Sequence, residues 1–193
     1  MGRLVLIRHG ESEGNRERAF TRTPDVPLTA EGQEQVRAAA GWIASLHEPV
    51  RIVSSPFARA RQTAGIIAER FPVPVVIEHD LRERSYGELA GQPYAAARAC
   101  ADYDPATYWA WCPPGGGETL VQVANRAGAA LDRIAAAAPA DDVVVVSHGA
   151  VMMALWRHVT GDWPRGRVSP NAGIVVVEHR HGRYLSATDG GRD

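Results

Sequence analysis

The sequence is poor in cysteine and has almost no net charge. Its 193 residues include only two cysteines, Cys100 and Cys112, and the formal net charge is −1 at pH 7. The spacing of the two cysteines suits neither a Cys-x-x-Cys redox pair nor a four-ligand zinc site. A general nucleic-acid-binding protein would usually carry a strong basic excess, so we do not expect a nucleic-acid partner. Any basic function must therefore be local.

Long hydrophobic runs are also missing. The N-terminal apolar stretch at 4–7 is far shorter than the core of a signal peptide, and no run approaches the length of a membrane-spanning helix. We therefore expect a cytoplasmic protein without a membrane partner. The hydrophobic content is 45%, and the chain has the usual size of one domain. A single domain over residues 1–193 with a substantial core is the expected organisation.

Short β-branched runs alternate with longer amphipathic or alanine-rich segments. This alternation is typical of an α/β fold, here a three-layer α/β/α sandwich in which helices cover both faces of a mainly parallel sheet. The expected strands are 4–7, 51–54, 73–77, 143–147, 173–178 and 184–187. Thr29 is expected to cap a helix. The apolar residues of that helix fall three or four positions apart and predict one buried stripe: Val36, Ala39, Ile43 and Leu46. Further helices are expected at 58–71, 119–138 and 150–159.

The segment between the third strand and the third helix has a different character. It is rich in alanine and aromatic residues and has no obvious strand, so we expect a small cap insertion at about 92–114. Its larger rings either pack within the cap or form a wall for the substrate: Tyr94, Tyr103, Tyr108, Trp109 and Trp111. The glycines at 115–117 are not followed by the Lys-Ser or Lys-Thr of a P-loop. We interpret them as a flexible lead into the next helix.

Three predicted strands end in polar, reactive residues. One strand leads into Arg8-His9-Gly10-Glu11-Ser12, a second into Ser54-Ser55-Pro56, and a third into Ser147-His148-Gly149. In an open α/β sheet, ligands bind outside the carboxyl ends of the strands, so these segments can share one pocket. Arg59 comes early in the helix after the second strand, and Glu83 lies in a turn shortly after another strand. We expect both side chains at the same rim.

Two arginines, two histidines and one carboxylate at one rim suggest phosphoryl transfer. Arg8 and Arg59 can clamp the non-bridging phosphoryl oxygens, because a guanidinium group matches that geometry bidentately. The neighbouring guanidinium charges favour a neutral His9, which would attack phosphorus. His148 would stabilise the equatorial oxygens in the transition state. Glu83, kept protonated by an anionic site, would protonate the departing alkoxide.

Four motifs occur along the chain in the order found in a known family. They are RHGES at 8–12, SSPFARARQTA at 54–64, LRERSYGELAG at 81–91 and VVSHGAVM at 145–152. On these motifs the sequence resembles the histidine phosphatase superfamily, specifically the branch that includes cofactor-dependent phosphoglycerate mutases and their phosphatase relatives. The resemblance covers nearly the whole chain.

The resemblance implies a role for each matching residue. His9 would be the phospho-acceptor, and Glu83 the proton donor. Arg8, Arg59 and His148 would complete the phosphate pocket. The positions of substrate contacts would be Ser12, Asn15, Thr21, Arg22, Arg84, Tyr86 and Gly149. Arg22 stands where the mutase branch often has glycine.

We expect neither a metal ion nor another cofactor. The two arginines and the second histidine supply the positive field that magnesium provides in other phosphoryl-transfer enzymes. His179 and His181 alternate along a predicted strand without acidic or cysteine partners. We therefore interpret this pair as exposed surface rather than as metal ligands.

Three functions remain open: a phosphomonoester hydrolase, a phosphoglycerate mutase and a non-catalytic module that binds a phosphorylated ligand. The binding module is least favoured, because every expected catalytic position holds the required residue type. The mutase branch holds its doubly phosphorylated intermediate with extra basic residues in a longer cap. Between Gln92 and Glu118, the only basic residue is Arg98. We therefore expect a metal-independent phosphatase for a small phosphomonoester. A homodimer is a reasonable expectation for a protein of this kind.

Overall fold

Six strands form one mixed sheet in the computed structural model, which describes residues 1–164, 168–180 and 182–190. The strands are β1 (Gly2–Arg8), β2 (Pro49–Ser54), β3 (Val75–Ile77), β4 (Asp142–Ser147), β5 (Ile174–Arg180) and β6 (Arg183–Asp189). Their order across the sheet is β3-β2-β4-β1-β5-β6. Only β5 runs against the other strands. The expected mainly parallel sheet is confirmed.

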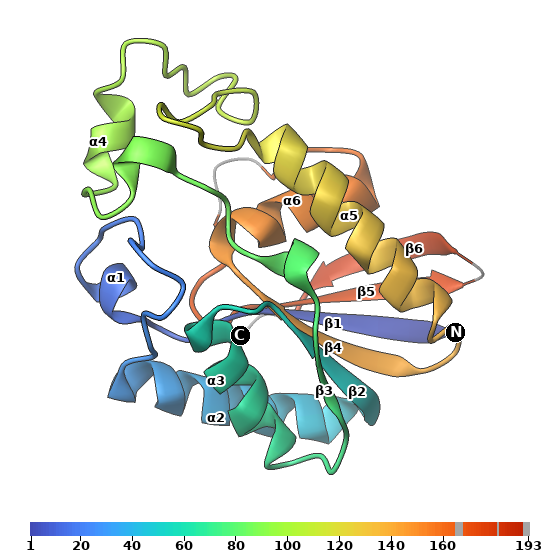
Figure 1. Ribbon diagram of the computed structural model, residues 1–193. Coiled ribbons are helices and arrows are strands. Elements are labelled where there is room, and N and C mark those ends of the chain that lie inside the picture. The colour runs from blue at the N-terminus through green and yellow to red at the C-terminus, as the bar shows by residue number, and fades with distance from the viewer. Residues whose placement is uncertain (165–167, 181, 191–193) are drawn as a thin grey trace.

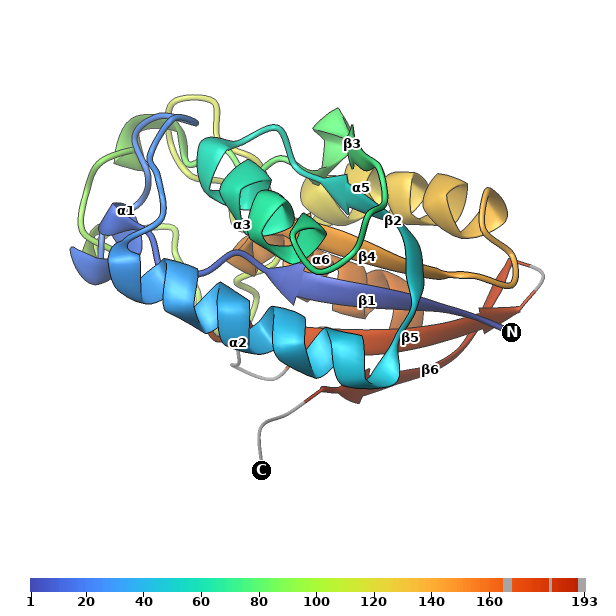
Figure 2. The ribbon, with the colours of Figure 1, turned by 90° about the horizontal axis from the view of Figure 1, so that it is seen from below.

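Helices cover both faces of the sheet. On one face lie α2 (Ala30–Leu46) and α3 (Ala58–Ala68), and on the other lie α5 (Leu120–Ala136) and α6 (Gly149–Thr160) (Figures 1 and 2). Successive side chains of a strand point to opposite faces, so a strand between two helical layers must be apolar throughout. In β1, Val5 and Ile7 pack toward α2 and α3, while Leu4 and Leu6 pack toward α5 and α6. The three-layer sandwich is confirmed.

Thr29 caps α2 as expected, since its Oγ1 accepts a hydrogen bond from the Gly32 amide at 2.9 Å. Val36 and Ile43 of the predicted stripe are buried. Leu46 is 55% exposed, so its assignment to the buried stripe is wrong. It is the last residue of α2, where the helix has run past the edge of the apolar layer that it covers.

Several one-turn elements lie between the long ones. These are α1 (Glu13–Arg16), η1 (His79–Leu81), η2 (Gly87–Leu89) and α4 (Ala95–Arg98). Figure 1 shows α1 and the segment carrying α4 beyond the end of the sheet at which β1 ends. In that segment, Trp111 and Leu89 form a small apolar cluster, with Tyr103 packed against it. Tyr108 and Trp109 pack instead against the start of α5 and against α6. The four aromatic side chains among these are therefore packing residues: Tyr103, Tyr108, Trp109 and Trp111.

His179 differs from the expectation of an exposed surface. Its side chain is fully buried, and its Nε2 atom would lie 2.7 Å from a Cβ atom at Gly2. Burial and, secondarily, the N-terminal amine lower the pKa of His179 below its usual value. The exposure expected for this residue is wrong, and its neighbour His181 lies outside the described residues. Within the described ranges, no helix combines the length and the apolar character needed to cross a membrane.

Candidate active site

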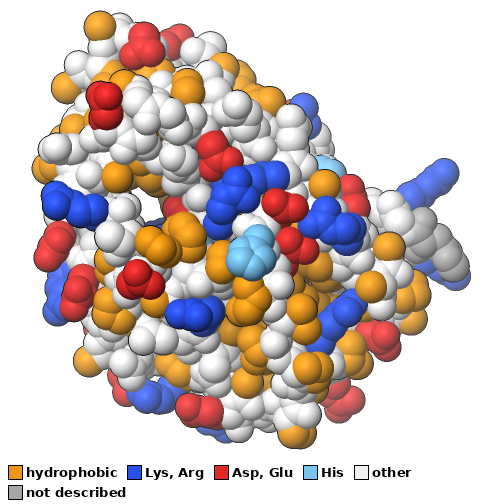
Figure 3. Space-filling view, in the orientation of Figure 1, with side chains coloured by type: hydrophobic (Ala, Val, Ile, Leu, Met, Phe, Trp, Pro, Cys, Tyr) orange, Lys and Arg blue, Asp and Glu red, His pale blue; other side chains and the backbone are white. Residues whose placement is uncertain are grey.

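The ends of three neighbouring parallel strands bring the polar motifs together. Arg8 at the end of β1 pairs with Ser147 at the end of β4, and the His9 amide donates to the Ser147 carbonyl at 2.9 Å. On the other side of β4, the Ser55 amide donates to the Val146 carbonyl at 3.0 Å. Because the strands stop at one edge, residues that follow them face a common space. Figure 3 shows the molecule hollowed between the cap side and the sheet side.

His9 is buried and neutral at this edge. Its Nδ1 atom lies 2.7 Å from the Gly10 carbonyl, and its Nε2 atom lies 3.1 Å from Nε of Arg59. A carbonyl can only accept, so Nδ1 carries the ring proton and Nε2 presents a lone pair to the Arg59 donor. Burial, reinforced by the charges of Arg59 and Arg8, holds the pKa of His9 well below its usual range. The imidazole is thus held neutral, with an unprotonated Nε2 atom.

Arg8 and Arg59 bring buried positive charge next to His9. Arg59, in the first turn of α3, is 1% exposed, and Arg8 donates from Nη1 to the Ser169 carbonyl at 2.6 Å. In the part of the chain that the structure describes, Nε of Arg8 and Nη1 of Arg59 are buried without an acceptor. A buried N–H group without an acceptor is rare and costly. These two donors therefore mark a site for an anion.

His148 contributes a third donor of this kind. It is fully buried, and its ring centroid lies 5.1 Å from that of His9. Its Nε2 atom lies 2.7 Å from the Ser55 hydroxyl oxygen, which itself accepts from the Phe57 amide at 3.3 Å. No other acceptor for this hydroxyl occurs among the described residues, so it donates to Nε2 and leaves the proton of His148 on Nδ1. That Nδ1 atom is buried and lacks a partner in the described ranges.

Burial also keeps His148 neutral. It is the main cause that holds the pKa of this imidazole well below its usual range, and the nearby Arg59 charge acts in the same direction. A neutral ring with its proton on Nδ1 remains a hydrogen-bond donor. His148 can therefore donate to an anion without carrying a charge of its own.

Glu83 adds the carboxyl group to this rim. One of its oxygens, Oε1, accepts a hydrogen bond from the Arg84 amide at 2.9 Å. Burial raises the pKa of Glu83, although the charges of Arg59 and Arg8 and the Arg84 amide oppose the rise. A raised pKa keeps the carboxyl protonated closer to neutral pH than an exposed glutamate. Glu83 can therefore hold a proton beside two buried arginines.

Ser12 and Asn15 form a small polar network beside His9. The amide and the hydroxyl of Ser12 both donate to Oδ1 of Asn15, at 3.2 and 3.0 Å. The same oxygen accepts from Nδ2 of Asn171 at 3.0 Å, and Nδ2 of Asn15 donates to the Tyr94 hydroxyl at 3.2 Å. Ser12 is therefore used internally, as the cap of α1. Asn15 links the strand end to Tyr94 of the cap, so this ring belongs to the site rather than to the interior of the cap.

Arg84 and Tyr86 lie where the cap meets the strand ends. Arg84 donates from Nε to the Glu118 carbonyl at 2.6 Å and from Nη2 to the Trp111 carbonyl at 2.7 Å. The Tyr86 ring stacks at 4.1 Å from Phe20. Arg84 thus connects the cap to the segment beside the strand ends. The Phe20 and Tyr86 rings form an aromatic wall next to it.

The remaining expected substrate contacts, Thr21, Arg22 and Gly149, differ in how deeply they are buried. Thr21 is half-buried, whereas Arg22 is exposed, and its guanidinium crosses Gly91 so closely that a Cβ atom there would lie 2.7 Å from Nε. Gly149 begins α6, where a Cβ atom would lie 3.5 Å from the guanidinium carbon of Arg8. Arg22 is therefore a cation on the outer surface, and Gly149 lies beside the buried pocket.

Comparison with known proteins assigns the family. The model of the histidine phosphatase superfamily, branch 1, matches residues 4–188. The chain belongs to this superfamily. The metal-independent phosphoserine phosphatase of Arabidopsis thaliana is 33% identical over 190 residues, which cover 94% of this chain and 78% of that protein. A solved mycobacterial glucosyl-3-phosphoglycerate phosphatase complexed with VO3 superposes with a TM-score of 0.85 at 28% identity, covering 99% of this chain and 98% of that one.

The superfamily also contains a mutase that is similar to this chain. A 2,3-bisphosphoglycerate-dependent phosphoglycerate mutase 2 of Gloeobacter violaceus is 37% identical over 134 residues, covering 65% of this chain and 60% of that protein. The resemblance to the histidine phosphatases is confirmed. Its relatives include both phosphatases and a mutase.

Sequence reasoning missed several residues that shape this histidine phosphatase site. Ser55 sets the tautomer of His148 although it stands inside a recognised motif. Asn171 donates to the His9 carbonyl at 3.4 Å and to Asn15. Its place directly after a Ser-Pro pair and shortly before β5 is a turn signal that could have drawn attention to it. Arg126, on the polar side of a long helix, gave no signal at all.

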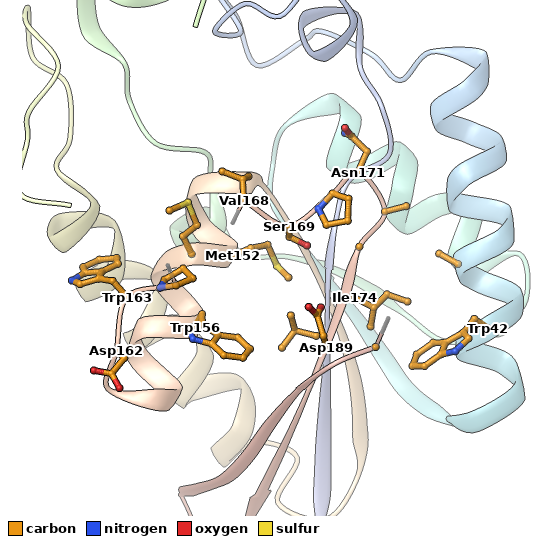
Figure 4. Close-up of a pocket in the computed structure, with 18 of the residues that line it drawn as sticks. Trp42, Met152, Trp156, Asp162, Trp163, Val168, Ser169, Asn171, Ile174 and Asp189 are labelled. Carbon is orange, nitrogen blue, oxygen red and sulfur yellow. The ribbon is translucent and has the colours of Figure 1, made fainter. Parts of the chain in front are cut away.

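A cavity of about 1190 Å³ lies beside the site of this histidine phosphatase, between α2, α6 and β5 (Figure 4). Trp42, Trp156 and Ile174 line it, and none of the expected site residues does. Ser169 and Asn171 line the cavity on the side of the strand ends. The Ser169 carbonyl accepts a hydrogen bond from Arg8, and the Asn171 side chain donates one to the His9 carbonyl. The unpartnered donors lie at the strand ends, so we place the reaction there and not in the cavity.

Proposed function

We propose that this chain is a metal-independent phosphomonoester hydrolase that forms a covalent phosphohistidine at His9. One observation carries the proposal. In the part of the chain that the structure describes, three buried N–H groups without acceptors, on Arg8, Arg59 and His148, lie around a neutral imidazole. A phosphoryl group has three non-bridging oxygens that accept hydrogen bonds, and its phosphorus is open to in-line attack.

The first half of the reaction transfers the phosphoryl group to the protein. The lone pair on Nε2 of His9 forms a bond to phosphorus, and the Arg59 donor moves from this nitrogen to a phosphoryl oxygen. The bond between phosphorus and the ester oxygen breaks. Glu83 supplies the proton that the departing alkoxide needs, so a neutral alcohol leaves. Arg8 and His148 stabilise the charge on the equatorial oxygens.

The second half regenerates the free protein. A water molecule attacks phosphorus in line, and the Glu83 carboxylate accepts its proton. The bond between phosphorus and Nε2 breaks, so His9 returns to its neutral form and inorganic phosphate is released. The buried arginines provide the positive field throughout, which removes the need for a metal ion. The name of the Arabidopsis relative, a metal-independent phosphatase, supports this part of the proposal.

Hydrolysis is favoured over transfer by the surroundings of the leaving alcohol. Tyr94 of the cap accepts a hydrogen bond from Asn15, Phe20 packs against both Tyr94 and Tyr86, and none of these three rings carries positive charge. Arg84 is tied to two carbonyls, and Arg98 is exposed. Few cations are therefore free to retain a second phosphate. A mutase remains the second candidate because of the similarity to the Gloeobacter enzyme.

Trapping the intermediate tests the proposed mechanism. The protein is mixed with a phosphomonoester labelled on phosphorus and quenched during turnover. We expect a labelled protein whose phosphate is stable in base and labile in acid, with the label on a peptide that contains His9. A label with the stability of phosphoserine would place the nucleophile at Ser12 or Ser54 and overturn the assignment.

A further inference from the structure

Arg126, from the middle of α5, holds the backbone that carries Glu83. It donates from Nη1 to the carbonyls of Asp80 and Arg82, at 2.6 and 2.8 Å. Its Nη2 atom reaches the Glu83 carbonyl at 3.3 Å. Its Nε and Nη2 atoms donate to the two carboxylate oxygens of Glu118, each at 2.8 Å. Every nitrogen of the guanidinium group is thus engaged.

Glu118 holds the other side of the same segment. Its Oε2 atom accepts from the Ser85 amide at 2.9 Å, and its carbonyl accepts from Nε of Arg84. The ion pair is largely covered, because the side chains of Arg126 and Glu118 are 12% and 19% exposed. Figure 3 shows acidic and basic side chains crowded together on this face, over the segment between β3 and α5. Arg126 thus holds the main chain up to Glu83, and Glu118 holds the residues that follow it.

The segment needs such support because it has little structure of its own. It follows the single turn η1 and makes no strand pairing. The carbonyls of Asp80 and Arg82 accept no backbone hydrogen bond among the described residues. One guanidinium group can serve several carbonyls at fixed angles, which a lysine ammonium cannot do. The Arg126 fork therefore fixes the main chain from which the Glu83 carboxyl projects.

We propose that Arg126, paired with Glu118, is a positioning residue for the proton donor Glu83. This inference rests on the proposed function, in which Glu83 protonates the leaving alcohol. Proton transfer requires a donor within hydrogen-bond reach of the ester oxygen. A small displacement of the carboxyl therefore slows phosphoryl transfer from a substrate with a poor leaving group, whereas the position of His9 is untouched.

The test compares two substrates in Arg126→Lys. This variant retains the positive charge and loses the planar guanidinium group that serves several carbonyls at once. A simple alkyl phosphate needs the acid, and p-nitrophenyl phosphate does not. We expect kcat/KM for the alkyl phosphate to fall about 10-fold or more, part of the ~10²–10⁴-fold that acid catalysis typically supplies. We expect kcat/KM for p-nitrophenyl phosphate to change by no more than about 2-fold, because kcat/KM covers only the steps up to departure of the alcohol, and p-nitrophenolate departs with little protonic help.

A double-mutant cycle with Glu83→Gln separates positioning from a general effect on structure. If Arg126 acts through Glu83, adding Arg126→Lys to Glu83→Gln causes no further loss with the alkyl phosphate. Additive losses, or equal slowing of both substrates by Arg126→Lys, would show that the residue supports the fold alone. The matched control is Arg133→Lys on the same helix. Arg133 is exposed and pairs with the side chains of Glu78 and Asp80, so both rates should be unchanged.

Glu118→Gln keeps the test decisive if Arg126→Lys does not fold. It leaves Arg126 bound to the carbonyls and removes the ionic partner, so the same selective loss is expected at smaller size. If Glu83→Gln itself slows both substrates equally, the proton-donor assignment is wrong, and this inference falls with it. If Glu83→Gln is selective and neither Arg126→Lys nor Glu118→Gln is, the inference alone is overturned.

Discussion

Nε of Arg59 donates a hydrogen bond to Nε2 of His9 across 3.1 Å. In the proposed mechanism the lone pair that attacks phosphorus is the one that this bond occupies, so the free protein would hold its nucleophile in a protected state. A phosphoryl oxygen is a stronger acceptor than a neutral imidazole, because it carries negative charge. Binding of the substrate therefore both engages Arg59 and frees His9. Arg59, whose charge adds to the effect of burial in keeping His9 neutral, would also release it.

Replacing the nucleophile should abolish turnover. We expect His9→Ala to lower kcat by about 10³-fold or more, since the covalent route is lost. The circular-dichroism spectrum should stay native, because the ring lies at the rim and not between the sheet and a helical layer. His158→Ala, which removes a partly exposed histidine of α6 paired with Asp132, is the control and should keep its activity. Near-normal rates in a folded His9→Ala would exclude this residue as nucleophile.

Chelation of metals should leave the activity unchanged. Arg8, Arg59 and His148 supply the donors that a metal ion would otherwise provide, and they are part of the chain. We expect the same rate of phosphate release before and after dialysis against EDTA. A loss of activity that a divalent cation restores would contradict the metal-independent mechanism.

Replacing the Glu83 carboxyl by an amide should slow substrates with poor leaving groups much more than substrates with good ones. Glu83→Gln cannot donate a proton, so we expect about 10²-fold slower hydrolysis of an alkyl phosphate. Transfer of the phosphoryl group from p-nitrophenyl phosphate to His9 should slow far less, because p-nitrophenolate departs with little protonic help. The measurement is kcat/KM for both substrates, because it excludes the later step in which Glu83 accepts a proton from water. Equal slowing would remove Glu83 from the proton-donor role.

Stability should fall as the solution becomes acidic, because two histidines are buried in neutral form. The pKa values of His9 and His148 lie well below 6.5 in the folded chain, chiefly through burial. Below pH 6.5 the unfolded chain binds protons that the folded chain does not, so each histidine lowers the unfolding free energy by up to about 1.4 kcal/mol per pH unit. Above pH 6.5 this loss is absent.

Urea unfolding measured between pH 7 and pH 5 provides the check. His148→Gln removes one of the two titrating groups, so the decline of the unfolding free energy with falling pH should become shallower. An identical slope in His148→Gln and the wild-type protein would show that this ring is not held neutral by the fold.

Long elements of this fold were predictable because their patterns are local. The buried run around Val5 in β1 is apolar on both faces, as a strand between two helical layers must be. The one-turn elements α1 and α4 were not predicted, since four residues carry no periodicity. His179 was misjudged because its burial comes from Gly2, a residue distant in sequence.

Within the site, prediction succeeded for residues whose chemistry is visible one at a time. The motifs placed His9 and His148 at neighbouring strand ends, where the structure brings them together. Their tautomers depend on the Gly10 carbonyl and the Ser55 hydroxyl, which only the folded chain brings into contact. Arg126 looks in the sequence like any polar residue on an exposed helix face. Its five hydrogen bonds arise because an irregular segment without strand partners lies across that face.

The choice between hydrolysis and transfer depends on what happens once His9 carries phosphate. A mutase must retain the first alcohol and rotate it, whereas a phosphatase must release it and admit water. The Phe20 and Tyr86 rings pack together where the cap meets the strand ends, and Arg84 is already bound to two carbonyls. A phosphoglycerate should therefore leave before the phosphoryl group returns to it, and water should attack the phosphohistidine in line.

Phosphorus NMR on one reaction mixture distinguishes the two outcomes. We supply 3-phosphoglycerate together with 2,3-bisphosphoglycerate and expect little 2-phosphoglycerate. A phosphomonoester with an uncharged or aromatic alcohol should release inorganic phosphate steadily under the same conditions. Rapid isomerisation of the phosphoglycerates, with inorganic phosphate as a minor product, would instead make this chain a mutase. In that case Arg22 is the first residue to replace, because it is an exposed cation, lying across Gly91, that could bind a second phosphate.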